Sequence, residues 1–236
     1  MNCLIIAAGH GSRLRDVSSS KPLTPVAGTP LIEHVVRAAA AGGARAFTVV
    51  TGHEAARLEA FLACLSGRLG LAIAPVRLAD WGRPNGHSVL AGAAALAGDY
   101  LLAMSDHLFD PEIVRLLLAA PPADLVLAVD PDLENPLLDM DDATKVALAP
   151  DGAIQRIGKT LERFDAIDTG LFRATLALAA ALEEAIAAGG VGSLSEGVQR
   201  LADRGKAMTV GTGGARWLDV DDPAALAKAE KMLGGG

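Results

Sequence analysis

The sequence predicts an α/β protein with a doubly wound, mainly parallel sheet. Short apolar runs typical of buried strands alternate with longer alanine-rich segments typical of helices. After Asp130 this alternation gives way to a proline- and acid-rich loop and then to a hairpin-like stretch. Strands that alternate with helices form parallel sheets covered on both faces, whereas a hairpin pairs antiparallel strands. We therefore expect one main sheet with a small antiparallel insertion at about 131–170.

Each expected strand is a short apolar segment bounded by turn residues or by a helical segment. In chain order, the expected strands are 3–7, 46–51, 71–76, 100–104, 125–129, 144–148, 154–157, 167–172, 208–210 and 216–220. The strands 144–148 and 154–157 flank Pro150-Asp151-Gly152, a sequence that favours a hairpin turn. These two strands form the expected antiparallel insertion.

Proline after a capping residue marks three helix starts. Thr29 and Pro30 predict an N-cap and a first-turn proline, and this helix should end at Gly42-Gly43. Asp110-Pro111 and Asp222-Pro223 predict two more starts of the same kind. Each aspartate is thereby expected to serve a helix end.

Composition limits the class of protein. With 236 residues and no linker-like stretch, the chain can bury a sizeable core, and we expect one domain over residues 1–236. Hydrophobic residues make up 51% of the chain, yet no apolar run reaches the roughly 18 residues that a membrane-spanning helix needs. A formal net charge of −7 argues against a general nucleic-acid surface. The expected ligands are therefore small molecules.

The N-terminus and the cysteines indicate a cytoplasmic setting. Met1-Asn2-Cys3 places no basic stretch ahead of the first apolar run, so we expect no signal peptide. Cys3 and Cys64 both lie in apolar surroundings and are expected to be reduced core thiols.

The most informative segment is the glycine-containing loop after the first strand. Residues 7–14 read AAGHGSRL, and Lys21-Pro22-Leu23 follows, so backbone amides and two cations can converge on phosphates. A dinucleotide fingerprint needs a third small residue where this chain has Leu14. A P-loop needs a glycine-lysine-serine or glycine-lysine-threonine string, which does not occur in the sequence. The loop therefore predicts a triphosphate site of another kind.

Together, AAGHGSRL and KPL resemble the nucleotide-binding signature of the sugar-phosphate nucleotidyltransferases. The resemblance implies that Arg13 and Lys21 meet the phosphates and act in catalysis. It also implies that small residues of the loop admit the base and the ribose. These small residues are Ala7, Ala8, Gly9, Gly11 and Ser12.

Nucleotidyl transfer has simple chemical needs. A phosphate monoester is already an anionic nucleophile near neutral pH, so positioning and charge neutralisation carry the reaction without a general base. Mg²⁺ held by carboxylates is the expected cofactor. Asp106 is the first candidate ligand, because it directly follows an apolar strand while Asp110 already serves the next helix. His107 should point the other way, as neighbours on a strand do, and is interpreted as structural.

The second carboxylate should come from the segment WLDVD. Asp219 and Asp221 alternate along an extended stretch, so both should face one side, while Asp222 caps the helix that begins at Pro223. Either residue, or both, is expected to share the metal with Asp106. The strings MSDHLF and WLDVD also resemble the two metal-binding segments of the inositol-phosphate cytidylyltransferase branch of this superfamily.

The acceptor and the base are assigned from further segments. By resemblance, Lys159 in the string IGK binds the phosphate monoester, and Asp168 and Thr169 of the string DTG line the acceptor pocket. The turn-rich loop around Asn85 and Gly86 is expected to read the base, because an amide offers both a donor and an acceptor to a pyrimidine edge.

The resemblance implies CTP and inositol 1-phosphate as substrates. Aromatic residues are 3% of the chain, and Phe164 is the only one between Lys145 and Gly170, which favours a polyol over a quaternary ammonium acceptor. Two alternatives stay open at this point. One is a nucleotidyltransferase for phosphocholine, a phosphonate or a hexose 1-phosphate, and the other is a non-catalytic nucleotide-binding protein. The oligomeric state is not predicted.

Overall fold

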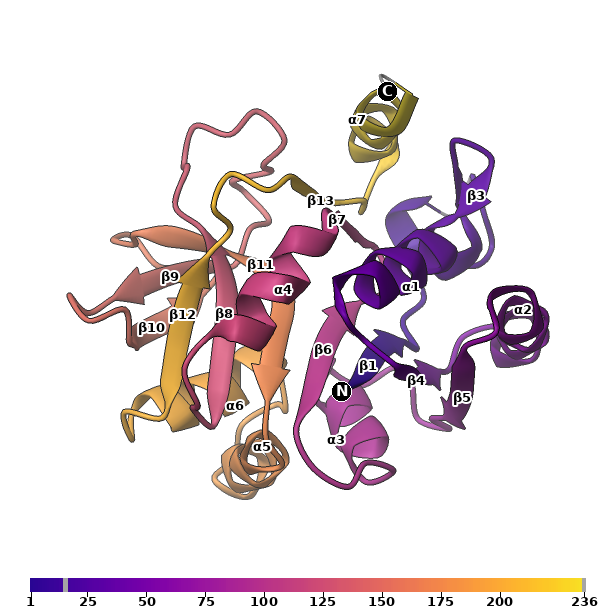
Figure 1. Cartoon of the computed structure of the whole chain (residues 1–236). Coiled ribbons are helices and arrows are strands. Elements are labelled where there is room, and N and C mark those ends of the chain that lie inside the picture. Colours follow the sequence, from indigo (N-terminus) through magenta and orange to yellow (C-terminus); the bar gives the residue numbers. More distant parts are fainter. Residues whose placement is uncertain (15–16, 235–236) are drawn as a thin grey trace.

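A computed structural model describes residues 1–14 and 17–234, and it is built around one large sheet with helices on both faces (Figure 1). The strands of this sheet are β1 (Asn2–Ala7), β4 (Ala46–Thr51), β5 (Ala72–Arg77), β6 (Tyr100–Met104), β8 (Leu125–Asp130), β9 (Lys145–Leu148), β10 (Ile154–Gly158), β11 (Ala166–Ala174) and β12 (Ala207–Gly211). The helices are α1 (Leu31–Gly42), α2 (Ala55–Leu69), α3 (Gly86–Ala93), α4 (Pro111–Ala119), α5 (Ala177–Ala187), α6 (Leu194–Ala202) and α7 (Pro223–Gly234).

The strand pairing confirms the predicted mainly parallel sheet. β5, β4, β1 and β6 are parallel neighbours in that order, and β12 runs parallel to β8. β11 is antiparallel to both β6 and β8 and joins the two halves. The hairpin of β9 and β10 attaches to the start of β11, which confirms the antiparallel insertion.

The expected last strand lies outside this sheet. β13 (Trp217–Asp219) pairs only with β7 (His107–Phe109), and together they form a separate two-stranded ribbon. β7 was not expected, because three residues are too few to show a strand periodicity. The ribbon matters for function, since Asp219 is paired with His107 in its register.

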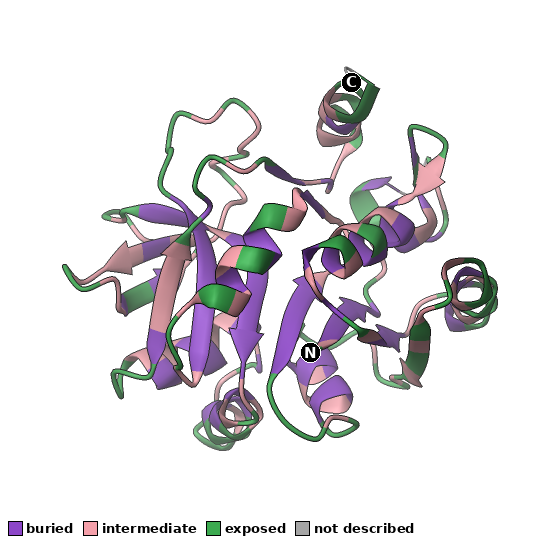
Figure 2. Ribbon diagram, viewed as in Figure 1, coloured by how far each residue is buried: buried purple, intermediate pink, exposed green. Residues whose placement is uncertain are grey.

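Alternating side chains along the strands build two core layers. Cys3, Ile5 and Ala7 of β1 pack against α1, α2 and α4, while Leu4 and Ile6 pack against α3, α5 and α6. Figure 2 shows the buried strands between helices whose outer faces are exposed. The expectation of two core thiols is wrong for Cys64, which is exposed on α2, because the apolar stripe of that helix runs through Leu58, Leu62 and Leu65 instead.

The start of α1 differs from the expectation. Thr29 lies in β3 (Thr29–Pro30), which pairs with β2 (Pro25–Val26), and Pro30 takes the N-cap position. Ala27 and Gly28 have φ of 47° and 77°, the conformation of a tight two-residue hairpin turn. The hairpin therefore claims Thr29 before the helix begins.

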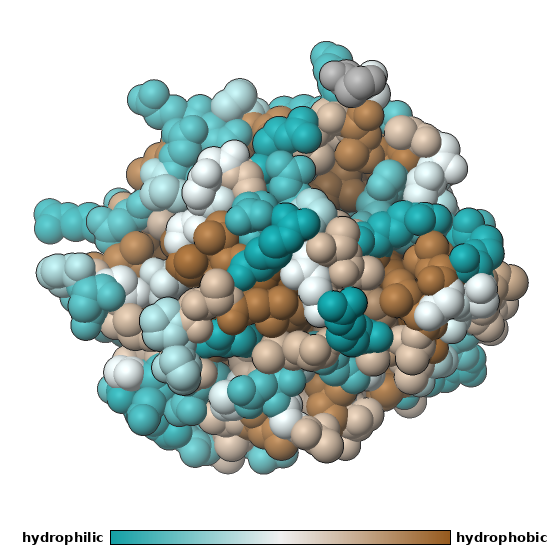
Figure 3. Space-filling model, viewed as in Figure 1, coloured by the Kyte–Doolittle hydropathy of each residue, from teal (hydrophilic) through white to brown (hydrophobic). Residues whose placement is uncertain are grey.

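The described part of the chain contains no helix long and apolar enough to cross a membrane. Hydrophilic residues are interspersed with hydrophobic ones over the face in Figure 3.

Candidate active site

A cavity of about 890 Å³ opens beyond the carboxyl ends of β1 and β6. This is the edge of an α/β sheet where ligands are expected to bind. It brings together most residues that the sequence singles out, although they come from distant parts of the chain. The predicted site residues that line it are Ala7, Ala8, Gly9, Gly11, Ser12, Arg13, Lys21, Asn85, Asp106, Lys159, Asp168, Asp219 and Asp221.

Lys21 is the most buried charged group of the cavity. It lies at the start of the short 3-10 helix Lys21–Leu23, its side chain is 8% exposed, and it forms ion pairs with Asp106 and Asp221. Burial by itself lowers the pKa of Lys21, but the two carboxylates outweigh it and hold the pKa above its ordinary value. Lys21 therefore stays charged and ties two of the predicted metal ligands together.

Gly11 makes room for this lysine. Its φ is +60°, and a Cβ there would lie 2.4 Å from the Cβ of Lys21. A side chain at position 11 would therefore strain the backbone and push the lysine out of place.

We expect Gly11→Ala to lower the free energy of unfolding by roughly 1–3 kcal/mol. Gly9→Ala is the matched control, because a Cβ at Gly9 meets nothing within 4 Å. Urea unfolding of both variants measures the difference, and equal stability of the two would contradict this role for Gly11.

Asp106, His107 and Asp219 form a compact cluster. One ligand atom from each lies within 4.8 Å of the others. Nε2 of His107 is 3.4 Å from Oδ2 of Asp219 and 3.8 Å from Oδ1 of Asp106, and Nδ1 is 2.7 Å from the carbonyl oxygen of Thr169. The expectation that His107 points away from Asp106 is wrong, because the chain turns at residues 105–106 and β7 begins at His107.

The histidine and the carboxylates of this cluster stabilise one another's charged forms. Burial lowers the pKa of His107, but Asp219 and Asp106 outweigh it and raise the pKa to about 10. Burial raises the pKa of Asp219, yet His107 and Lys21 hold it at about 2. His107 is therefore an imidazolium that donates toward Asp219 and to Thr169, and Asp219 is ionised.

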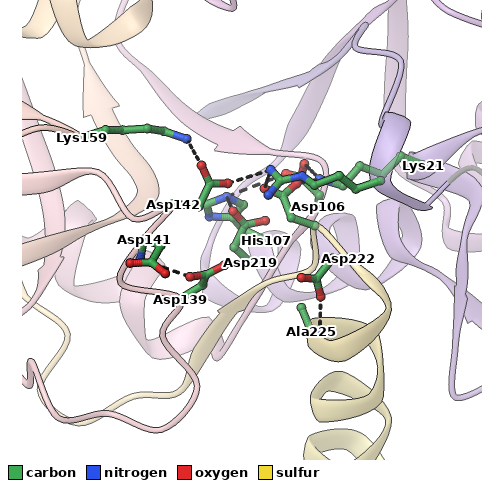
Figure 4. Close-up of polar contacts among 12 residues, drawn as sticks. Lys21, Asp106, His107, Asp139, Asp141, Asp142, Lys159, Asp219, Asp222 and Ala225 are labelled. Atoms are coloured by element: carbon green, nitrogen blue, oxygen red, sulfur yellow. Dashed lines mark hydrogen bonds and ion pairs between the residues drawn. The ribbon is translucent and has the colours of Figure 1, made fainter.

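Asp221 lies with the cations instead of with His107. One of its oxygens contacts Lys21, and Oδ2 is 2.5 Å from Nη2 of Arg13. The same Nη2 is 2.7 Å from Oδ2 of Asp142, and the other oxygen of Asp142 forms an ion pair with Lys159. A continuous row of alternating charges thus runs from Lys159 to Asp106 (Figure 4).

Asp168 and Thr169 lie at the beginning of β11 and play different parts. Burial raises the pKa of Asp168 to about 6. The hydrogen bond that its Oδ1 accepts from the amide of Gly170 at 2.7 Å acts in the opposite direction and lowers the pKa, but burial outweighs it. Thr169 does not line the cavity. Its hydroxyl donates to the carbonyl of Ala128 at 2.8 Å, while its own carbonyl holds His107.

Asn85 and Gly86 lie at the start of α3. Oδ1 of Asn85 accepts a hydrogen bond from the amide of Leu194 at 2.8 Å, so the acceptor of this side chain is already engaged at the start of α6. Gly86 is outside the cavity lining, and a Cβ there would lie 2.4 Å from the carbonyl oxygen of Gly192. The close approach that Gly86 permits is thus to another part of the backbone. Trp81 and Arg83 line the same side of the cavity.

The two aspartates expected to serve helix ends differ. Oδ1 of Asp222 accepts from the amide of Ala225 at 2.7 Å and caps α7, as predicted. Asp110 occupies the N-cap position of α4, but its side chain makes no capping bond there and instead accepts from the amide of Arg216 at 3.0 Å. Asp110 therefore anchors the strand that carries Asp219.

Asp142 is a charged site residue that sequence reasoning missed. It belongs to the acid-rich loop 131–144, which shows no periodicity and carries neighbouring acids at Asp139 and Asp141. Only its contacts with Arg13 and Lys159 set it apart, and these depend on segments far away along the chain.

The chain is similar in sequence to known proteins. The family model of the MobA-like NTP transferase domain matches residues 3–163. The chain belongs to this family. A curated relative from Rubrobacter xylanophilus, named as a bifunctional IPC transferase and DIPP synthase, is 39% identical over 97% of this chain and 51% of its own length. The chain thus spans about half the length of this relative and of two others that carry the same name, from Aquifex aeolicus and Thermococcus kodakarensis.

Two solved structures share the fold. The inositol-1-phosphate CTP transferase from T. maritima superposes with a TM-score of 0.86 at 23% identity, over 98% of this chain and 96% of that one. A UDP-glucose pyrophosphorylase complexed with UDP-glucose superposes with a TM-score of 0.79 at 15% identity, over 99% and 98% of the two chains. This fold is therefore common to proteins named for different nucleotides and acceptors.

Proposed function

We propose that this chain transfers a cytidylyl group from CTP to inositol 1-phosphate, giving CDP-inositol and pyrophosphate. The observation that carries the proposal is the convergence of Arg13, Lys21 and Lys159 with Asp106 and Asp219 on one cavity. Three cations and a pair of carboxylates are what a reaction between two phosphates needs. The choice of CTP and inositol 1-phosphate rests on the names of the relatives and on the low aromatic content of the acceptor region.

The site fits a divalent cation, which we propose to be Mg²⁺. Oδ1 of Asp219 is buried without a hydrogen-bond partner among the described residues, so a ligand is needed there. Asp106 and Asp219 would hold the ion, because carboxylate oxygens are the ligands that Mg²⁺ prefers. Nδ1 of His107 donates to the carbonyl oxygen of Thr169 and Nε2 lies 3.4 Å from Oδ2 of Asp219, so His107 orients Asp219. When bound, the ion neutralises charge on the reacting phosphates.

The residues of the chain divide the remaining work. A phosphate oxygen of the acceptor attacks the α-phosphorus of CTP, the new P–O bond forms in line, and the bond to the β-phosphate bridging oxygen breaks, releasing pyrophosphate. No proton must be removed from an ionised monoester. Lys159 orients the acceptor phosphate, and Arg13 and Lys21 neutralise the triphosphate. The small residues of the glycine loop leave space for base and ribose.

The acceptor pocket suits hydroxyl groups. Asp168 lines the cavity, and its carboxylate can accept hydrogen bonds from a ring of hydroxyls. Phe164 is the only aromatic residue between Lys145 and Gly170, and it packs against the ammonium of Lys145, whose Nζ is 5.6 Å from the ring centre. Phe164 also lies outside the cavity lining, so the insertion presents no aromatic ring to a choline group there. Reduced Cys3 and Cys64 accord with the cytoplasmic setting that we also propose.

Acceptor selectivity tests this assignment. With CTP, we expect kcat/KM for inositol 1-phosphate to exceed that for phosphocholine at least tenfold, a difference of about 1.4 kcal/mol in transition-state binding. The measurement is pyrophosphate release with both acceptors side by side. Equal or inverted preference would reject inositol 1-phosphate as the acceptor.

A further inference from the structure

Asp142 connects the two halves of the proposed active site. Its Oδ2 is 2.7 Å from Nη2 of Arg13, which belongs to the glycine loop. Its Oδ1 contacts the ammonium of Lys159, which directly follows β10 of the insertion. These two cations serve different substrates in the proposed reaction, the triphosphate and the monoester. The carboxylate of Asp142 therefore contacts both cations, one through each oxygen.

The two cations keep donors to spare. Among the described residues, Arg13 contacts Asp142 and Asp221 through Nη2, so these two contacts leave Nε and Nη1 for a phosphate. Lys159 uses one of the three donors of an ammonium for Asp142. Substrate phosphates can therefore bind while the carboxylate stays in place.

Without this carboxylate Lys159 would lose the ion pair that orders it, and Arg13 would keep only its contact with Asp221 among the described residues. Arg13 and Lys159 are 50% and 56% exposed, and long exposed side chains sample many rotamers. Backbone hydrogen bonds of its loop hold Asp142 in place. The amide of Ala143 donates to the carbonyl of Asp139 at 2.9 Å. The amide of Asp168 donates to the carbonyl of Thr144 at 2.9 Å. The base of the loop is fixed by buried Asp130, whose Oδ2 accepts from Nε1 of Trp217 at 2.8 Å.

We propose that Asp142 is a positioning residue that holds Arg13 and Lys159 side by side, so that the nucleotide phosphates and the acceptor phosphate are presented to each other in the geometry of transfer. This rests on the proposed function of the site. Lys159 and Arg13 also hold the pKa of Asp142 well below its ordinary value, so the bridge is charged at neutral pH. Asp142 acts through the two cations and touches no reacting atom itself.

The neighbouring acid offers a matched control. In Figure 4, Asp142 points toward Lys159 and the Asp106 cluster, whereas Asp141 lies beside Asp139 on the outer part of the loop. The backbone amide of Asp141 donates to Oδ1 of Asp139 at 3.2 Å. Asp141→Asn therefore makes the same chemical change in the same loop without touching the bridge.

The test is a double-mutant cycle between Asp142 and Lys159, read as kcat/KM for inositol 1-phosphate at saturating CTP. Asp142→Asn should lower this constant about tenfold in the parent but by only about threefold in the Lys159→Ala background, because one of the two cations that it positions is already missing there. Asp141→Asn should stay within about twofold of the parent. Equal losses in both backgrounds would overturn the proposal and assign Asp142 to loop stability. A gain in kcat/KM would overturn it by showing that the carboxylate competes with phosphate.

A second measurement needs no turnover. Within the described part of the chain, Asp142 is the link between Lys159 and Arg13, so Lys159→Ala should shift the side-chain Nε–H signal of Arg13 in ¹⁵N-edited NMR spectra of the parent, and not in the Asp142→Asn background. The signal is assigned by its loss in Arg13→Lys. The same shift in both backgrounds, or no shift in either, would contradict the bridge. If the parent does not turn over CTP with inositol 1-phosphate, the proposed function fails, and the NMR result alone decides on the bridge.

Discussion

Asp106→Asn is expected to lower kcat by at least about a hundredfold, because it removes one of the two carboxylates proposed to hold the divalent cation. The substitution is nearly isosteric. Lys21 keeps its contact with Asp221, so the buried lysine is not left without a partner and the fold should persist. Pyrophosphate release at saturating CTP and Mg²⁺ measures the loss, and far-ultraviolet circular dichroism checks the fold.

Asp99→Asn is the control for this variant. Asp99 undergoes the same chemical change seven positions before Asp106, but it is exposed and lies outside the cavity lining. Activity of Asp106→Asn within a few-fold of the control would remove Asp106 from the metal site.

Lys21→Met is expected to have the largest effect on stability. The side chain of Lys21 is 8% exposed and neutralises Asp106 and Asp221, so removing its charge leaves two carboxylates crowded together in a partly buried place. The loss of one partner from such a cluster costs on the order of 3 kcal/mol. Methionine fills nearly the same volume, so most of the loss reports the missing charge.

Arg13→Met gives the comparison. Arg13 also pairs with two carboxylates, but it is 50% exposed, and exposed ion pairs contribute at most about 1 kcal/mol. Urea unfolding at neutral pH separates the two variants. If both lose the same stability, the burial of Lys21 is not what makes its charge important.

The strands and the glycine loop could be predicted because local pattern decides them. The expected strands 46–51 and 100–104 coincide with β4 and β6, and the hairpin around Pro150-Asp151-Gly152 forms as its turn residues indicate. Aliphatic runs bounded by turns leave few alternatives when the sheet is covered on both faces. The site residues on these elements could be proposed for the same reason, since strand ends of a parallel sheet meet at one edge.

The parts that escaped prediction depend on contacts between distant segments. β7 and β13 are three residues each, and their pairing brings His107 to Asp219 across more than a hundred positions of sequence. Strand alternation predicts that His107 faces away from Asp106, but the chain turns at residues 105–106, so the two residues do not belong to one strand and the alternation does not apply. Asp142 could not be told from Asp139 or Asp141 by composition, because only tertiary structure aligns it with Arg13 and Lys159.

The row of charges explains how an acidic chain can handle polyanions. The chain has a net charge of −7, yet its cavity holds Arg13, Lys21 and Lys159 in fixed places. Each is paired with carboxylates, which orders long side chains before any substrate arrives. A divalent cation bound to Asp106 and Asp219 would neutralise carboxylate charge and leave a positive site for the triphosphate.

If this chain joins CMP to inositol 1-phosphate, the α-phosphate of CTP must pass into the product, and a label at that phosphate follows the transfer itself. The protein is incubated with CTP labelled at the α-phosphate, inositol 1-phosphate and Mg²⁺, and the products are separated by chromatography. We expect the label to move into CDP-inositol with one pyrophosphate released for each molecule formed. Label that remains in CTP, or that appears only as CMP, would contradict the account.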